Sequence, residues 1–102
     1  MSFVIVATVV PKPESRDAVR EALLAAVPQV HTERGCELYS VQEDEQGFVF
    51  VERWADQEAM AGHAQGEALK TLMATVSDHL AQPLDVRVLQ PLPAGDPDKG
   101  AV

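Results

Sequence analysis

The sequence predicts a single α+β domain built on an antiparallel sheet. Runs of β-branched and aromatic residues alternate along the chain with segments whose apolar residues recur at the spacing of an amphipathic helix. The 102 residues suit one domain, and 46% hydrophobic with 24% charged residues is an ordinary globular composition.

Residues 3–10 form a continuous β-branched run, which is typical of a strand buried on both faces in the middle of a sheet. Pro11 and Pro13 end this strand. From Ser15, a candidate N-cap, an apolar pattern with spacings of three and four predicts a helix to about Arg34. We expect Gly35 to end the helix.

Pro28 lies inside this helical pattern. Proline removes one backbone donor and clashes with the preceding turn, so we expect a kink near residues 24–27 and one continuous helix.

Two strand-like runs, residues 36–43 and 48–54, flank a short polar loop that contains Gly47. They predict a β-hairpin. Asp56 then opens a short helix over residues 57–64.

A second helix follows Gly66, with an apolar stripe from Leu69 to Leu80, and Pro83 closes it. Residues 84–92 alternate apolar and charged side chains, as in an edge strand. Residues 1–92 therefore form the domain. Residues 93–102, rich in proline, glycine and aspartate, form a tail expected to be disordered.

This order of elements, βαββαβ, is the ferredoxin-like arrangement. Right-handed crossovers place all helices on one face of its sheet. The hairpin strand is nevertheless apolar on both faces, because Phe48 and Phe50 point one way and Val49 and Val51 the other. We therefore expect a homodimer in which two sheets pack face to face.

The formal net charge of -8 leaves no basic stripe for phosphates, which excludes nucleic acid and anionic membranes as expected partners. No apolar run approaches the roughly 20 residues of a membrane span. A lone cysteine, Cys36, and an N-terminus unlike a signal peptide favour a cytoplasmic location. The histidines lack metal-ligand spacing, so we expect no metal site, and Cys36 is expected to act as a small apolar residue.

The hairpin register brings the candidate site residues together. A four-residue loop places Tyr39 opposite Glu52, and it pairs Glu43 with Phe48, Val41 with Phe50 and Glu37 with Trp54. Tyr39, Phe50, Glu52 and Trp54 then share one face, which we assign to the helix side, and His63 overhangs it. Val49, Val51 and Arg53 belong to the dimer side.

An aromatic-lined pocket with a few polar groups is the usual form of a small-molecule site. The competing interpretation is that Tyr39, Phe50 and Trp54 are plain core. In that case Glu52 is a structural ion-pair partner of Arg34 or of Arg53 of the partner subunit.

Several local patterns resemble one family. These are Val6-Ala7-Thr8 before Pro11-Lys12-Pro13, Glu33-Arg34-Gly35-Cys36-Glu37-Leu38-Tyr39, Phe48-Val49-Phe50-Val51-Glu52-Arg53-Trp54, and His63 nine residues later. In order and spacing they resemble the antibiotic biosynthesis monooxygenase domain, including its quinol monooxygenase branch, over about residues 3–92.

The resemblance implies a dimeric α+β barrel that oxidises a small phenol or hydroquinone to a quinone with O2, without metal, flavin or other cofactor. It assigns Trp54 and Phe50 to sandwich the aromatic substrate, His63 to act as base or hydrogen-bond partner, Tyr39 to orient a substrate oxygen and Glu52 to fix its neighbours.

One departure is that the chain contains no asparagine, whereas the antibiotic-pathway oxygenases and the haem-degrading relatives resemble one another in using a pocket asparagine. Two alternatives stay open: an isomerase or detoxifying enzyme for a small carbonyl metabolite, and a non-catalytic dimeric module that binds a small ligand.

Overall fold

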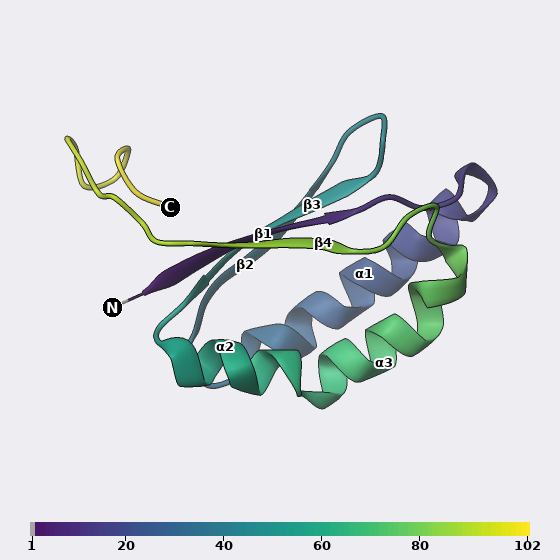
Figure 1. Cartoon of the computed structure of the whole chain (residues 1–102), viewed down its shortest axis with the longest axis horizontal. Coiled ribbons are helices and arrows are strands. Elements are labelled where there is room, and N and C mark those ends of the chain that lie inside the picture. Colours follow the sequence, from purple (N-terminus) through teal and green to yellow (C-terminus); the bar gives the residue numbers. More distant parts are fainter. Residues whose placement is uncertain (1) are drawn as a thin grey trace.

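The computed structural model describes residues 2–102 and has the predicted order of elements (Figure 1). The strands are β1 (Phe3–Val9), β2 (Cys36–Glu43), β3 (Phe48–Trp54) and β4 (Asp85–Leu89), and the helices are α1 (Arg16–His31), α2 (Gln57–Ala64) and α3 (Glu67–Val76), with short 3₁₀ helices η1 (Pro13–Ser15) and η2 (Ser77–His79). The four antiparallel strands lie in the order β2-β3-β1-β4, and the three α-helices cover one face. This confirms the ferredoxin-like α+β fold.

The central position predicted for the first strand is correct, because β1 pairs with β3 on one side and β4 on the other. β4 is an edge strand, as its alternating sequence indicates, but it spans only residues 85–89 of the predicted 84–92.

The hairpin register is confirmed at Tyr39 and Glu52, and it fails at one predicted pair. Cys36, in place of Glu37, lies opposite Trp54, because a bulge between Cys36 and Leu38 adds one residue to β2. The bulge lets the Glu37 carboxylate accept a hydrogen bond from Arg53 Nε at 3.0 Å on the face away from the helices.

α1 begins after Ser15, as predicted, but it ends before the predicted Arg34. It stops at His31, and Gly35 adopts a left-handed φ of 78° in the turn that follows. Ser15 is the N-cap residue but makes no cap hydrogen bond; its hydroxyl lies 3.0 Å from His79 Nδ1 and ties the start of α1 to η2. Pro28 lies within one continuous α1, and the kink stays a prediction.

α2 has the predicted bounds, and the Asp56 carboxylate caps it by accepting from the Ala59 N–H at 2.8 Å. α3 ends at Val76, earlier than predicted, and η2 carries the chain on to Leu80, which packs against the core. The apolar stripe continued past the α-helix because a 3₁₀ turn keeps similar side-chain spacing.

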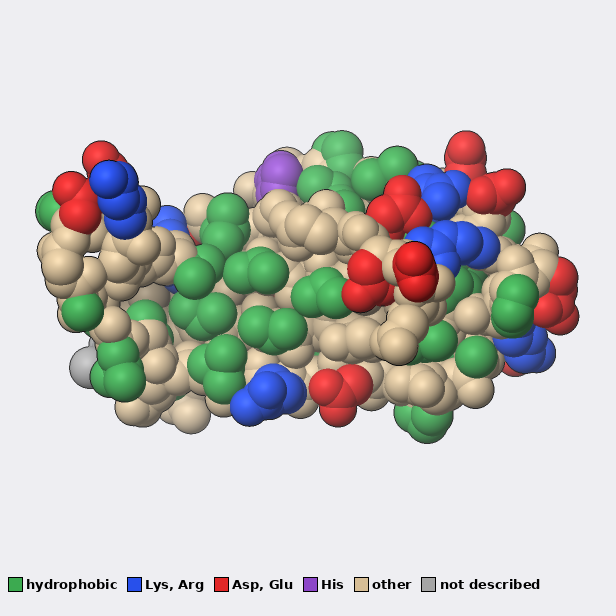
Figure 2. Space-filling view, turned by 90° about the horizontal axis from the view of Figure 1, so that it is seen from above, with side chains coloured by type: hydrophobic (Ala, Val, Ile, Leu, Met, Phe, Trp, Pro, Cys, Tyr) green, Lys and Arg blue, Asp and Glu red, His purple; other side chains and the backbone are tan. Residues whose placement is uncertain are grey.

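The core lies between the sheet and the helices, with Leu23 of α1 and Trp54 of β3 among its most buried side chains. On the other face of the sheet, Val6, Val49 and Val51 of the two central strands are half-buried without helix cover. Figure 2 shows apolar side chains gathered over the middle of this outer face. No helix within residues 2–102 has the length and hydropathy to cross a membrane.

Residues 93–102 fold back in a turn in which the Gly100 N–H donates to the Asp96 carbonyl at 2.8 Å. The disorder expected for this tail stays a prediction.

Candidate active site

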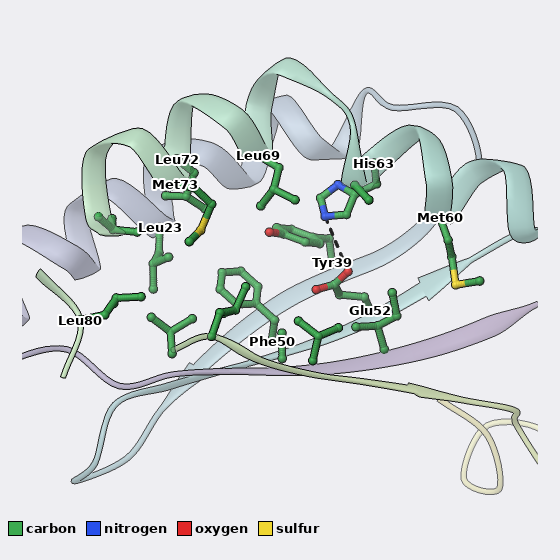
Figure 3. Close-up of a pocket in the computed structure, with 17 residues that line it drawn as sticks. Leu23, Tyr39, Phe50, Glu52, Met60, His63, Leu69, Leu72, Met73 and Leu80 are labelled. Carbon is green, nitrogen blue, oxygen red and sulfur yellow. Dashed lines mark ion pairs between the residues drawn. The ribbon is translucent and has the colours of Figure 1, made fainter. Parts of the chain in front are cut away.

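A cavity of about 150 Å³ lies between the helices and the sheet (Figure 3). Of the 17 residues drawn there, all but Tyr39, Glu52 and His63 have purely apolar side chains. Phe50 of β3 lies on the sheet side of the cavity, and Leu69, Leu72 and Met73 of α3 line it from the helix side. The three polar side chains are therefore held in a largely apolar space.

His63 lies in the last turn of α2 and is only 7% exposed. The cap at Asp56 fixes where α2 begins, so the helical phase directs His63 towards the sheet. Its ring stacks on Trp54, with centroids 4.6 Å apart, and meets the edge of Tyr39 at 5.5 Å. The aromatic neighbours leave the imidazole little freedom to rotate.

Two carboxylates flank this imidazole. His63 Nδ1 lies 2.8 Å from Glu33 Oε1, and His63 Nε2 lies 3.9 Å from Glu52 Oε1, the pair joined by the dashed line in Figure 3. Because a carboxylate accepts hydrogen bonds, we assign the proton to Nδ1, and in that tautomer the lone pair of Nε2 is on the cavity side. The tautomer is assigned from this hydrogen bond.

Glu33 is a site residue that sequence reasoning missed as a partner of His63. It lies in the turn between α1 and β2, and it also lines a polar surface groove with Arg34 and Glu58. Its only signal in the sequence is its place at the head of the motif that ends at Tyr39.

Glu52 is 4% exposed and accepts a hydrogen bond from Trp54 Nε1 at 2.9 Å. Burial raises the pKa of Glu52, while the indole hydrogen bond and the nearby His63 act against that rise. The predicted ion pair with Arg34 does not form, because Arg34 pairs with Asp56 at 3.0 Å and with Glu58 at 3.4 Å.

Tyr39 points its hydroxyl into the cavity, away from His63 (Figure 3). Within residues 2–102 the hydroxyl makes no hydrogen bond, and the ring packs against Phe50 with centroids 4.8 Å apart. Burial, together with the negative charges of Glu52 and Glu33, raises the pKa of the phenol. The hydroxyl therefore stays protonated at neutral pH and is free to donate to a ligand oxygen.

The structure brings Tyr39, Phe50, Glu52 and His63 together around the cavity, but it places Trp54 outside the lining. The indole is fully buried beneath His63 and bonded to Glu52. Cys36 of β2 lies opposite Trp54 and is half-buried. Burial raises the pKa of its thiol, which disfavours a nucleophilic thiolate.

Within the described residues, no group of three or more histidine, cysteine or acidic side chains is arranged to hold a metal ion.

The sequence profile of the antibiotic biosynthesis monooxygenase family matches residues 2–75. The chain belongs to that family.

Relatives of this antibiotic biosynthesis monooxygenase domain agree with the fold. A Mycobacterium tuberculosis (strain ATCC 25618 / H37Rv) protein named "Putative monooxygenase Rv0793" is 31% identical over 90 residues, which cover 86% of this chain and 89% of the relative. The solved structure of Rv0793 has a TM-score of 0.86 at 28% identity and covers 94% of this chain and 100% of that one.

A second solved structure, from Nitrosomonas europaea and named "Putative antibiotic biosynthesis monooxygenase", has a TM-score of 0.83 at 21% identity, with 89% of this chain and 90% of that one covered. At that identity the likeness concerns the fold alone.

Proposed function

We propose that this protein is a cofactor-independent monooxygenase of the quinol type, which oxidises a small phenol or hydroquinone with O2 in the cavity beside His63. The observation that carries the proposal is the free Nε2 of His63, held beside Glu52 at the polar end of an apolar cavity. Membership of the monooxygenase family supports the same reaction type.

The reaction balances without a reductant. A phenol with a free para position and one O2 give a quinone and one water, and a hydroquinone gives a hydroxyquinone and one water. The substrate supplies all four electrons. One oxygen atom enters the ring and the other leaves as water with the two substrate hydrogens.

His63 takes the first step in this proposal. Its Nε2 accepts the phenol proton, and the resulting imidazolium is stabilised by Glu33 at Nδ1 and by Glu52 beside Nε2. The phenolate then gives one electron to O2, and the radical pair combines at a ring carbon as a peroxide. Imidazolium returns the proton to the peroxide oxygen, and loss of water with the ring hydrogen forms the quinone.

The other residues orient the substrate. Phe50 packs against its ring and the Tyr39 hydroxyl donates to a substrate oxygen, while the apolar walls exclude water from the charged intermediates. Because Trp54 lies outside the cavity lining, the proposal gives it a positioning role beneath His63 instead of the sandwich with Phe50 that the sequence predicts.

The proposal includes a homodimer. The outer face of the sheet carries half-buried Val6, Val49 and Val51, and a second copy packed sheet to sheet would bury them. The helices lie on the opposite side of the sheet, and the cavity is lined by helix residues such as Leu72, so each subunit keeps its own site.

Oxygen uptake with a panel of phenols and hydroquinones tests the proposal, using metal-free protein. Replacing His63 by Ala or Gln should lower substrate-dependent uptake at least about 100-fold, the usual contribution of a general base. His79→Ala is the matched control, because this exposed histidine contacts Ser15 and is not among the residues that line the cavity. Oxygen uptake by His63→Gln at the wild-type rate would rule out His63 as the base.

The same base beside a buried carboxyl group also suits proton abstraction next to a carbonyl, which keeps a carbonyl-metabolite isomerase as the second candidate. Exchange of substrate hydrogens with deuterated water, without oxygen uptake, would favour it. Ligand binding without oxygen uptake or hydrogen exchange would favour the non-catalytic ligand-binding module.

A further inference from the structure

We infer that the cavity takes uncharged, single-ring aromatics that carry a small alkyl group, and that it excludes fused-ring and anionic aromatics. This inference names the substrate class and rests on the proposed function only for the use of the same cavity. Three features of the cavity lead to it: its volume, the absence of a cation in its lining, and the separation of its polar and apolar ends.

The volume limits the ring system. At about 150 Å³, the cavity matches the size of apolar protein cavities that bind one benzene molecule. Its walls are core side chains, including Phe50 and Leu72, which are 3% and 7% exposed. A second fused ring would have to displace packed atoms, which close-packed interiors resist.

The charges of the lining exclude anions. No lysine or arginine is among the residues that line the cavity, whereas Glu52 is buried in it. His63 is already flanked by Glu33 and Glu52. A carboxylate on the substrate would be desolvated beside these groups without a cation of its own.

Four of the five arginines are engaged at the surface: Arg16 and Arg20 pair with Glu43, Arg34 with Asp56, and Arg53 with Glu37. The fifth, Arg87, is exposed on β4 opposite Val6, on the face of the sheet away from the cavity.

One end of the cavity favours a small alkyl group on the ring. Figure 3 shows Leu23, Met73 and Leu80 at the end of the cavity away from His63 and Glu52. A methyl or ethyl group at the far end would lie among these apolar side chains. Each buried methylene is worth about 0.8 kcal/mol, which tightens binding about fourfold.

The mouth of the cavity also suits an apolar ligand. Val86 of β4 lines the cavity and is 50% exposed, and its neighbour on the same side of the strand, Val88, is 58% exposed. A ligand therefore enters along β4 past hydrocarbon surface.

Anaerobic binding tests the inference independently of oxidation. Trp54 is the only tryptophan and stacks on His63, so its fluorescence reports ligands beside that ring. The probes are methylhydroquinone, 1,4-naphthohydroquinone and 2,5-dihydroxybenzoate, which differ in one methyl group, one fused ring or one carboxylate. Methylhydroquinone should bind at least about 10-fold more tightly than either of the others, as the packing and charge penalties require.

A cavity-enlarging variant sharpens the test. Met73→Ala should tighten naphthohydroquinone binding at least about 10-fold and leave dihydroxybenzoate binding unchanged, because it adds volume without adding a cation. Leu24→Ala is the control, because Leu24 is 53% exposed and outside the cavity. The wild-type comparison stands by itself if the Met73 variant does not fold.

Binding of naphthohydroquinone or dihydroxybenzoate as tightly as methylhydroquinone would overturn the inference, and so would binding of none of the three. The predicted order of binding with no oxygen uptake in air would uphold the inference and refute the proposed oxidation. Rapid oxidation of carboxylated or fused-ring substrates would support the proposed oxidation and refute the inference about the substrate class.

Discussion

His63 is held between two carboxylates whose surroundings differ. The Glu33 side chain is 20% exposed and faces a polar groove, whereas that of Glu52 is 5% exposed and faces the cavity. In the proposed reaction, Glu33 selects the tautomer of His63, and Glu52 adds negative charge where the imidazolium forms. Environments that separate the roles of neighbouring titratable groups are typical of catalytic sites.

Replacing Glu52 by Gln should stabilise the protein at neutral pH. Burial raises the pKa of Glu52 above its unfolded value, so its contribution to stability is fully present below the unfolded pKa of about 4.5 and is lost as pH rises through the folded pKa. Glutamine keeps an oxygen for the Trp54 Nε1–H without the charge. Urea unfolding at pH 7 and pH 4.5 should show a gain for the variant at pH 7 that shrinks at pH 4.5.

Glu43→Gln is the control for that experiment. The Glu43 pKa is lowered, chiefly by hydrogen bonds from Arg20 and then Arg16, so neutralising this group should not stabilise the protein at pH 7. A destabilised Glu52→Gln at pH 7 would contradict the account.

The sequence placed Tyr39, Phe50, Glu52 and His63 correctly because strand alternation and one hairpin loop determine which side chains share a face. It missed the Glu33 to His63 contact, which spans 30 residues and depends on how the turn after α1 meets α2. It also assigned Trp54 to the ligand, since alternation identifies a face but not the depth of a side chain within it.

At the scale of elements, α2 carries His63, and its distance from the sheet depends on Gly35. A Cβ atom on Gly35 would lie 2.4 Å from the Ala59 Cβ of α2, so only glycine allows this close approach. Gly35 also has a left-handed φ of 78° and accepts from the Ala55 N–H at 2.8 Å. The turn before β2 therefore helps to position the helix that carries His63.

Gly35→Ala should lower the free energy of unfolding by about 2 kcal/mol, through left-handed strain and the clash with Ala59. The displaced helix should also slow oxygen uptake. Gly62→Ala is the matched control, since a Cβ there meets nothing within 4 Å and should stabilise α2 by about 1 kcal/mol. Urea unfolding measures the free energy of unfolding of both variants. Equal values for the two would refute this role of Gly35.

The strands and α2 were predicted with nearly their observed bounds because prolines, glycines and the Asp56 cap mark their ends. The C-terminal ends of α1 and α3 were predicted too late in the chain. Apolar periodicity runs on through the turns that follow both helices, and no local residue distinguishes α from 3₁₀ geometry there.

At the scale of the whole molecule, the helices lie on one face of the sheet and the other face carries an apolar patch (Figures 1 and 2). The patch is the reason for the proposed dimer, since a second copy would cover it without further chain.

Val51→Asp should dissociate the proposed dimer, raising its dissociation constant at least about 100-fold, because an unpaired carboxylate would be buried between the sheets. Leu24→Asp is the control, since Leu24 is exposed on α1 and lies on the helix side. Sedimentation equilibrium measures both. A wild-type monomer, or a Val51→Asp variant that remains dimeric, would contradict the sheet-to-sheet interface.

The most direct test of the central claim is oxidation of methylhydroquinone under ¹⁸O2, with the product reduced at once to prevent exchange with water and then analysed by mass spectrometry. The monooxygenase account predicts one ¹⁸O atom in the ring product and the other in water, with neither formed by His63→Gln. A product without ¹⁸O, accompanied by hydrogen peroxide, would show simple dehydrogenation and contradict the account.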